Sequence, residues 1–263
     1  MKTIGKKNQN NIPVFITARM GSTRLPGKHL LEMCGKPNIE QMINRIKQAK
    51  LSEFIVLCTT SLPEDDVLIE IANRCNIKCF RGNPTDILKR WLDAADYFGV
   101  QSFVSAEADD VFCDPEFIDI ITLELQTNTY DYISCKGMPF GVTPTGIKVE
   151  ALRKICSLKK ENDTEGQERF FTRTGLFKVH YIEITDPELI NSDARMTLDY
   201  PEDYEFFKRV FSCMGRDGKY FSLRKILVLL KEHPEIIEIN KKMQLIYEQR
   251  YTEKYGAVNL NKA

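Results

Sequence analysis

Hydrophobic residues along this chain follow two patterns, short continuous runs and longer segments with a spacing of three and four. Residues 12–17 (I-P-V-F-I-T) form an apolar run, which is typical of a strand buried on both faces of a parallel sheet. Ile39, Met42, Ile43 and Ile46 follow at a spacing that places all four on one face of a helix. The first unit of the chain is therefore a strand, a loop and a helix.

The same alternation continues to about residue 126. We expect strands at 54–59, 77–80 and 102–106, and helices at 64–74, 87–95 and 115–126. Four strands separated by helices are typical of a parallel sheet with crossover connections. Ligands of such sheets bind beyond the carboxyl ends of the strands. The candidate binding loops are therefore those that begin at Ala18, Arg81 and Glu107.

The pattern is less regular in the second half of the chain. We expect strands at 130–135, 178–184 and 196–198, helices near 150–158 and at 201–211, and an irregular Gly- and Pro-rich passage at 138–146. From residue 222 onward the apolar spacing predicts amphipathic helices, first with Leu223, Ile226, Leu227 and Leu230 and then over 236–255. These helices pack either on the domain or on a second subunit.

Together these elements predict an α/β fold. We expect a three-layer, mostly parallel twisted sheet with a Rossmann-like nucleotide-binding half, plus C-terminal helices. We divide the chain into a polar, disordered tail at 1–11, a domain at 12–221 and a helical extension at 222–263.

Composition excludes several classes of protein. The chain has 263 residues, of which 43% are hydrophobic and 28% charged, as in an ordinary globular protein. The 37 basic residues equal the 37 acidic ones, which favours neither a nucleic-acid partner nor a membrane surface. The chain shows no run of eighteen apolar residues, and its eight cysteines lack the spacing of a disulfide framework or a zinc site. We expect a cytoplasmic protein that does not span a membrane.

The loop A-R-M-G-S-T-R-L-P-G-K, from Ala18 to Lys28, is the first candidate for chemistry. Its glycines allow the backbone to approach a ligand closely, and Arg19, Arg24 and Lys28 supply three positive charges within ten residues. Because the loop directly follows the first strand, we interpret it as a polyphosphate site rather than a solvated turn. It is not a Walker A loop, since His29 stands where that motif needs Ser or Thr.

Acidic residues lie at the ends of two other expected strands. Asp109 belongs to the segment E-A-D-D-V-F-C-D-P at 107–115, and Asp199 follows the expected strand at 196–198. A carboxylate beside a triphosphate repels it unless a divalent cation lies between them, so both are candidate metal ligands. The alternative is helix capping, which suits Asp114 before Pro115. Asp199 is also an N-cap candidate unless it meets Asp109 in space.

The combination of these segments resembles a known family. The loop G-S-T-R-L-P-G-K, the segment D-Y-P-E-D at 199–203 and F-R-G-N-P-T-D-I-L-K-R-W at 80–91 are similar to cytidylyltransferases of the 3-deoxy-manno-octulosonate and acylneuraminate type, especially their spore-coat-polysaccharide branch. The likeness runs from about residue 12 to residue 211. It implies Mg²⁺, a homodimer, and transfer of CMP from CTP to a small acidic acceptor with release of pyrophosphate.

The resemblance also implies roles for single residues. Arg19, Arg24 and Lys28 would bind phosphates, and Asp109 and Asp199 would hold the metal; these five form the expected catalytic set. The residues expected around the base and ribose, or near the nucleotide, are Ala18, Arg19, Met20, Gly21, Ser22, Arg81, Asp86 and Glu107. Glu107 stands where octulosonate enzymes carry Gln, and Gln167-Glu168 stands where the branch has Glu-His, so base preference and acceptor stay open.

Two other functions are compatible with the same residues. One is a uridylyl- or guanylyltransferase that makes a sugar nucleotide from a sugar phosphate. The other is a nucleotide-binding regulatory or scaffold protein without turnover. In the preferred reaction an acceptor oxygen attacks the α-phosphorus in line, so positioning and charge stabilisation dominate catalysis. The acceptor loop is expected within 136–148 or 164–173, where Arg169 and Arg173 face either an acidic substrate or solvent.

Overall fold

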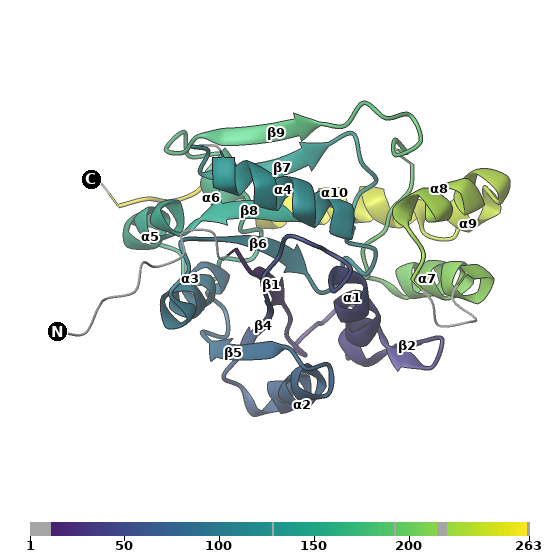
Figure 1. The fold of residues 1–263 in the computed structure, drawn as a ribbon, viewed down its shortest axis with the longest axis horizontal. Helices are drawn as coiled ribbons and strands as arrows, with labels where there is room; N and C mark the ends of the chain where they lie inside the picture. The colour runs from purple at the N-terminus through teal and green to yellow at the C-terminus, as the bar shows by residue number, and fades with distance from the viewer. Residues whose placement is uncertain (1–11, 128, 192, 215–219, 262–263) are drawn as a thin grey trace.

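The computed structural model describes residues 12–127, 129–191, 193–214 and 220–261, so the expected tail at 1–11 lies outside the described residues. Seven described strands form one sheet in the order β5-β4-β1-β6-β8-β7-β9 (Figure 1). Only β8 runs against the others. The bounds are β1 (Val14–Thr17), β4 (Ile55–Thr60), β5 (Lys78–Gly82), β6 (Ser102–Glu107), β7 (Tyr132–Lys136), β8 (Thr145–Lys148) and β9 (Val179–Glu183). The predicted mostly parallel α/β sheet is confirmed.

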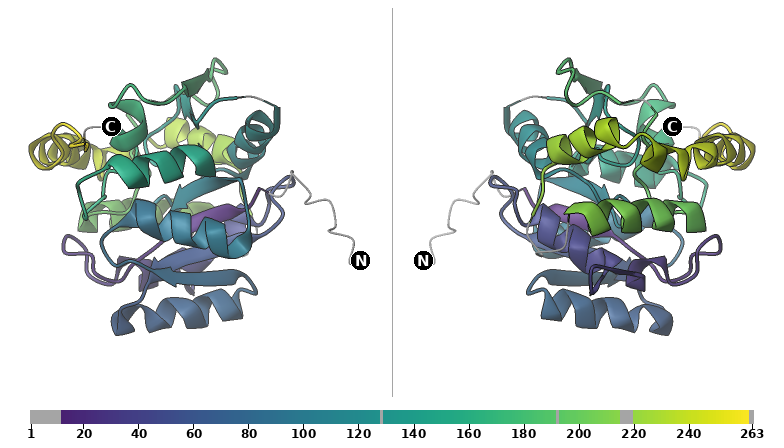
Figure 2. Two further views of the ribbon diagram at one scale, coloured as in Figure 1. Left: turned by 90° about the vertical axis from the view of Figure 1, so that its left-hand side faces the viewer. Right: turned by 90° about the vertical axis from the view of Figure 1, so that its right-hand side faces the viewer.

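Helices cover both faces of this sheet and complete three layers (Figures 1 and 2). One face carries α1 (Asn38–Ile46), α2 (Asp66–Arg74), α4 (Pro115–Thr127), α7 (Pro201–Met214), α8 (Leu223–Glu232) and α9 (Glu235–Glu238). The other carries α3 (Ile87–Phe98), α5 (Val149–Leu158) and α6 (Arg169–Thr172). A small hairpin of β2 (Glu32–Met33) and β3 (Lys36–Pro37) and two 3-10 turns, η1 (Lys28–Leu30) and η2 (Pro63–Asp65), complete the first half.

The central strand β1 shows why the sequence folds this way. All four of its residues are buried, and their side chains alternate between the two faces of the sheet. Val14 and Ile16 enter the core under α1 and α4, whereas Phe15 enters the core under α3. There the ring of Phe15 stacks on Phe103 at 4.5 Å between centroids. A continuous apolar run is thus needed to fill both layers at once.

Two predictions about the second half need correction. β8 falls partly within the passage 138–146 that was expected to be irregular. Its Gly146 is required because a Cβ there would lie 2.6 Å from Ile121 Cγ2 of α4, and a glycine in so short a strand hides the strand pattern. The expected strand at 196–198 is wrong. Backbone hydrogen bonds hold that segment instead, from Met196 N to Phe140 O (2.7 Å) and from Leu198 N to Asp109 O (2.9 Å).

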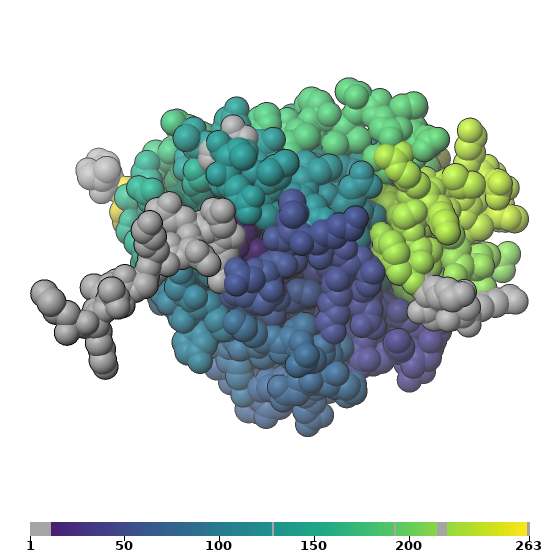
Figure 3. Space-filling model, viewed as in Figure 1, coloured from purple at the N-terminus to yellow at the C-terminus, as the bar shows by residue number. Residues whose placement is uncertain are grey.

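The C-terminal helices differ from one another in how they pack. Leu223, Ile226, Leu227 and Leu230 of α8 belong to the same core as α1 and α4. In the space-filling view the yellow-green C-terminal region lies directly against the first half of the chain (Figure 3). α10 (Lys241–Lys254) buries none of its residues and stands apart at one side of the molecule (Figure 2). The expectation of one amphipathic pattern over 236–255 is therefore wrong for α10. The division of the chain at residue 222 stays a prediction.

Two general expectations can be compared with the structure. The eight cysteines are all free thiols, as their spacing predicted. Within the described part of the chain, no helix has the length and apolar character needed to cross a membrane.

Candidate active site

A cavity of about 810 Å³ lies at the carboxyl ends of β1 and β6. Thr17 and Glu107 at the ends of these strands line it, together with the 18–28 loop, the 138–143 passage and α10. This is the edge of the sheet at which a parallel α/β fold binds its ligands. The expected residues that line the cavity are Ala18, Arg19, Gly21, Ser22, Arg24, Lys28, Glu107, Asp109 and Asp199.

The 18–28 loop is folded by its own polar groups. Ser22 N donates to Met20 O at 2.8 Å, and Leu25 N donates to Ser22 Oγ at 3.4 Å. Gly27 then takes a φ of 66° and begins η1, a left-handed conformation that costs glycine little. The turn carries the Lys28 side chain into the cavity wall, where only 8% of it is exposed.

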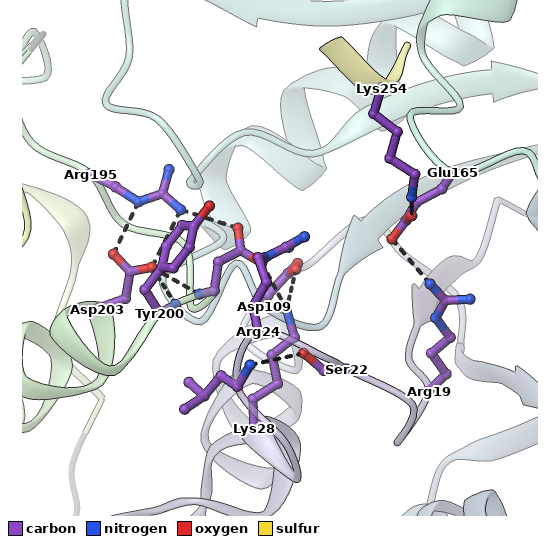
Figure 4. A network of polar contacts seen from close by, with 12 residues as sticks. Arg19, Ser22, Arg24, Lys28, Asp109, Glu165, Arg195, Tyr200, Asp203 and Lys254 are labelled. Atoms are coloured by element: carbon purple, nitrogen blue, oxygen red, sulfur yellow. Dashed lines mark hydrogen bonds and ion pairs between the residues drawn. The ribbon is translucent and has the colours of Figure 1, made fainter. Parts of the chain in front are cut away.

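Lys28 contacts both carboxylates that were predicted to hold a metal, and Figure 4 shows its side chain pointing to Asp109. Its Nζ lies 2.7 Å from Asp109 Oδ2 and 3.0 Å from Asp199 Oδ1. Arg24 forms a further ion pair with Asp199 Oδ1. Burial raises the pKa of Asp199, but the positive charges of Lys28 and Arg24 outweigh it and hold this pKa well below its usual range. Two acidic groups 90 residues apart in the sequence therefore converge on one cation.

Asp199 is held by cations and does not cap a helix. Besides Lys28 and Arg24, Arg195 donates to Asp199 Oδ2 at 3.1 Å. The carboxylate that accepts backbone N–H groups at the start of α7 belongs to Asp203, which bonds Asp199 N and Tyr200 N at 2.9 Å each. The capping alternative for Asp199 is therefore wrong.

Asp114, in contrast, has the structural role that the sequence predicted. It accepts from Glu116 N at 2.9 Å at the start of α4 and pairs with the buried Arg45 at 3.0 Å.

The chemistry of Asp109 and Asp199 fits a magnesium ion. A single cationic group, the ammonium of Lys28, already lies within hydrogen-bond distance of both carboxylates. Among the described residues no group of three or more His, Cys, Asp or Glu side chains is placed to hold a metal. Mg²⁺ suits this donor set, since it is held by one or two carboxylates together with phosphate oxygens and water.

Glu107 and Arg90 line the base of the cavity near Gln167. Gln167 Nε2 donates to Glu107 Oε1 at 2.7 Å, and burial together with the nearby charge of Asp109 raises the pKa of Glu107 to about 8. Sequence reasoning did not single out Arg90. Its side chain is fully buried and its Nε has no hydrogen-bond partner among the described residues. The signal was available, because Arg90 lies inside the 80–91 segment that carries the family resemblance.

Three residues expected near the nucleotide lie outside the cavity lining. Arg81 donates to Thr60 O and Leu62 O and pairs with Asp66 at 2.9 Å, so it stabilises the turn after β4. Asp86 caps α3 by accepting from Lys89 N, and it also pairs with the buried Lys159. The backbone N–H of Met20 donates a hydrogen bond to Asp65 Oδ1 at 2.6 Å. The positions of Arg81, Asp86 and Met20 therefore do not support the predicted nucleotide contacts.

The opposite wall of the cavity comes from α10, inside the predicted helical stretch 236–255, and from residues 163–168, which overlap the predicted acceptor segment 164–173. Sequence reasoning did not single out the residues that face the cavity there. Tyr247, Tyr251 and Tyr255, four residues apart, line it from α10 and the residue after its end, and Glu165 lines it from the 163–168 segment. The four-residue spacing of the tyrosines was the available signal. For Arg169 both alternatives, an acidic substrate and solvent, are unsupported, because its side chain is buried outside the cavity beside Glu161 at 3.5 Å.

Comparison with known proteins identifies the family. Residues 14–249 match the sequence model of the cytidylyltransferases. The chain belongs to the cytidylyltransferase family. Its reaction class is therefore the transfer of CMP from CTP. The chain is 26% identical over 234 residues to the spore coat polysaccharide biosynthesis protein SpsF of Bacillus subtilis, covering 86% of this chain and 96% of SpsF.

Solved structures agree with this assignment. A cytidylyltransferase from Leptospira borgpetersenii superposes with a TM-score of 0.75 at 28% identity, covering 86% of this chain and 96% of that one. A CMP:2-keto-3-deoxy-manno-octonic acid synthetase complexed with CTP superposes with a TM-score of 0.59 at 13% identity, covering 77% and 99% of the two chains. The second similarity shows that this chain and the synthetase share a fold.

Proposed function

We propose that this cytidylyltransferase transfers CMP from CTP to a small acidic sugar or a related hydroxyl or phosphate acceptor, with Mg²⁺ held by Asp109 and Asp199. The convergence of these two carboxylates with Lys28 and Arg24 at the ends of β1 and β6 carries the proposal. This arrangement supports the proposal because the positive groups that would bind a triphosphate and the acidic groups that would hold a cation line the same cavity.

The chain's own residues would perform three tasks in this reaction. Arg19, Arg24 and Lys28 bind the phosphates and stabilise the charge that grows on the departing pyrophosphate. The 18–28 loop holds the nucleotide so that the α-phosphorus faces the acceptor half of the cavity. Mg²⁺, when bound, neutralises phosphate charge and lowers the pKa of a bound hydroxyl. Lys28 lies between Asp109 and Asp199 and holds the two carboxylates close together, where they would bind the cation.

The acceptor would bind between the nucleotide loop and α10. This part of the cavity is lined by the hydroxyls of Ser134 and Thr143, by Glu168, and by the rings of Tyr247 and Tyr251. Hydroxyl and carboxylate groups suit a polyhydroxylated molecule. The cavity volume of about 810 Å³ lies within the range of roughly 300–1,000 Å³ that is usual for small-molecule sites.

Pyrophosphate release tests the proposal and separates it from the two alternatives. The purified protein is assayed with Mg²⁺, each of the four nucleoside triphosphates, and a panel of sugar acids, sugar phosphates, polyol phosphates and phosphonates. We expect release with CTP and at least one acid of the panel. Release only with UTP or GTP and a sugar phosphate would favour the other transferase, and CTP binding without release from any acceptor would favour a non-catalytic nucleotide-binding protein. A homodimer and a cytoplasmic location stay predictions.

A further inference from the structure

One carboxylate connects the nucleotide loop with the C-terminal helix (Figure 4). Glu165 Oε1 lies 3.1 Å from Arg19 Nη2. Its other oxygen, Oε2, forms an ion pair with Lys254 at the end of α10 and accepts from Tyr255 Oη at 2.8 Å. Burial raises the pKa of Glu165, but the hydrogen bonds of Lys254 and Tyr255 and the charge of Arg19 outweigh it and lower this pKa to about 2. Glu165 is therefore ionised and shared by two cations.

α10 buries none of its own residues, so its position depends on contacts made by partly exposed side chains. In its middle, the ring of Tyr247 packs on Phe140 at 5.1 Å between centroids, and Tyr251 Oη donates to Glu168 at 3.3 Å. At its start, Asn240 Nδ2 donates to Asp203 Oδ1 at 2.9 Å, and Gln244 Oε1 accepts from Arg195 at 3.0 Å. At its end, the contacts to Glu165 hold Lys254 and Tyr255. A helix held in this way has a low local stability. A change in its contact with Glu165 therefore changes how firmly the helix is held at the wall of the cavity.

We propose that Glu165 is a positioning residue that divides its charge between Arg19 and the end of α10, so that the binding of a nucleoside triphosphate by Arg19 tightens the hold of Glu165 on α10. The inference rests on the proposed function in one respect, namely that Arg19 is a phosphate ligand. The proposal also implies a sequence of events: the nucleotide binds first, and α10, which forms the cavity wall on the acceptor side, becomes more firmly held afterwards.

The physical reason is competition between like charges for one anion. Arg19 and Lys254 repel each other, so each weakens the contact that the other makes with Glu165. When Arg19 binds the phosphates, its contact with Glu165 weakens, and the Glu165 carboxylate interacts with Lys254 and Tyr255 alone. By the same reasoning, loss of Lys254 leaves Arg19 more firmly on Glu165, and loss of the Glu165 charge frees Arg19 for phosphate. The three side chains are 30–42% exposed, so the effects are modest.

Calorimetric titration with CTP and Mg²⁺, without acceptor, tests the proposal in three variants. We expect Lys254→Gln to weaken CTP binding about threefold to fivefold and Glu165→Gln to tighten it by a similar factor. Lys242→Gln removes the same charge from an exposed position of the same helix and should change the Kd less than about twofold. The proposal requires that Lys254→Gln and Glu165→Gln change the Kd for CTP in opposite directions. If the contact between them were purely structural, removing either partner would change this Kd in the same direction.

A double variant and a hydrogen-exchange measurement distinguish this role from a direct contact between Lys254 and phosphate. In the Glu165→Gln background, Lys254→Gln should leave the Kd for CTP unchanged; a further weakening would mean that Lys254 contacts phosphate directly and would overturn the proposal. In the wild type, CTP should slow hydrogen exchange of 241–255, and Glu165→Gln should abolish this slowing. The inference would be rejected if both single variants changed the Kd for CTP in the same direction, or if CTP left the hydrogen exchange of 241–255 unchanged. CTP binding itself would still be established in either case. A wild-type protein that does not bind CTP would reject the proposed function itself.

Discussion

Asp109 and Asp199 share one lysine but have different surroundings. The Asp109 side chain is 26% exposed and faces the cavity, whereas that of Asp199 is 3% exposed and receives bonds from Lys28, Arg24 and Arg195. Asp109 can therefore contact a ligand directly, and it contributes less to folding than Asp199 because its buried partner, Lys28, also pairs with Asp199. Asp199 also neutralises positive side chains that the fold itself buries.

Replacing each aspartate by asparagine should separate these two roles. We expect Asp109→Asn to lower turnover by about two orders of magnitude or more, since one charge stabiliser is lost, and to lower the unfolding free energy by about 1 kcal/mol, because buried Lys28 keeps Asp199 as a partner. Asp199→Asn should lower turnover as much and also destabilise the fold by about 3 kcal/mol, because buried cations lose their partner. Pyrophosphate release and urea unfolding measure the two effects. Wild-type turnover in Asp109→Asn would contradict its assignment as a metal ligand.

The lowered pKa of Asp199 also predicts how stability depends on pH. A carboxyl whose folded pKa lies below its unfolded value of about 3.9 binds fewer protons in the folded state, so its stabilising contribution is present above that value. The contribution is lost as the pH falls from about 4 toward the folded pKa. The stability difference between the wild type and Asp199→Asn, measured by urea unfolding at a series of pH values, should therefore be full at pH 7 and should shrink below pH 4.

Strands and helices were predictable where one physical requirement dominated. β1 had to be apolar throughout because both its faces are covered, and α1 and α3 showed a clear helical spacing. β8 was missed because it is short and carries Gly146, which is there to let α4 approach. The sequence predicted a helix where α10 lies, but it could not predict how α10 packs, because its contacts come from distant residues such as Glu165, Arg195 and Phe140 that no local pattern reveals.

The difference between α8 and α10 leads to a stability prediction. Leu230 of α8 is completely buried in the main core, whereas Leu245 of α10 is 72% exposed. We expect Leu230→Ala to lower the unfolding free energy by about 2–5 kcal/mol, because it removes buried methyl groups and leaves a cavity. Leu245→Ala, the matched control, should change it by about 0.5 kcal/mol or less. Urea unfolding measures both, and equal effects would show that α8 is not part of the core.

Across the folded chain, the candidate site arises from segments that are close only after folding. The sequence predicted the polyphosphate loop and both aspartates because each follows an expected strand, although the strand expected at 196–198 before Asp199 is not formed. It could not predict the contact between Leu198 N and Asp109 O, which sets the two carboxylates side by side. Nor could it predict that Glu165 meets Arg19 across 146 positions. Such contacts depend on the order of strands in the sheet and on the path of long loops, which local patterns leave undefined.

Ligand binding to this assembled site should stabilise the entire fold. A ligand at a concentration of about 100 Kd adds roughly 2.7 kcal/mol, which for a domain of this size raises Tm by about 5–10 °C. We expect differential scanning calorimetry to show this shift with CTP and Mg²⁺ and a clearly smaller one with CTP and EDTA, since phosphate charge then faces Asp109 and Asp199 without a cation between them. Asp109→Asn is the matched control, because it should reduce the difference between the two conditions. Equal shifts for the wild type with and without Mg²⁺ would show that these carboxylates do not hold the metal.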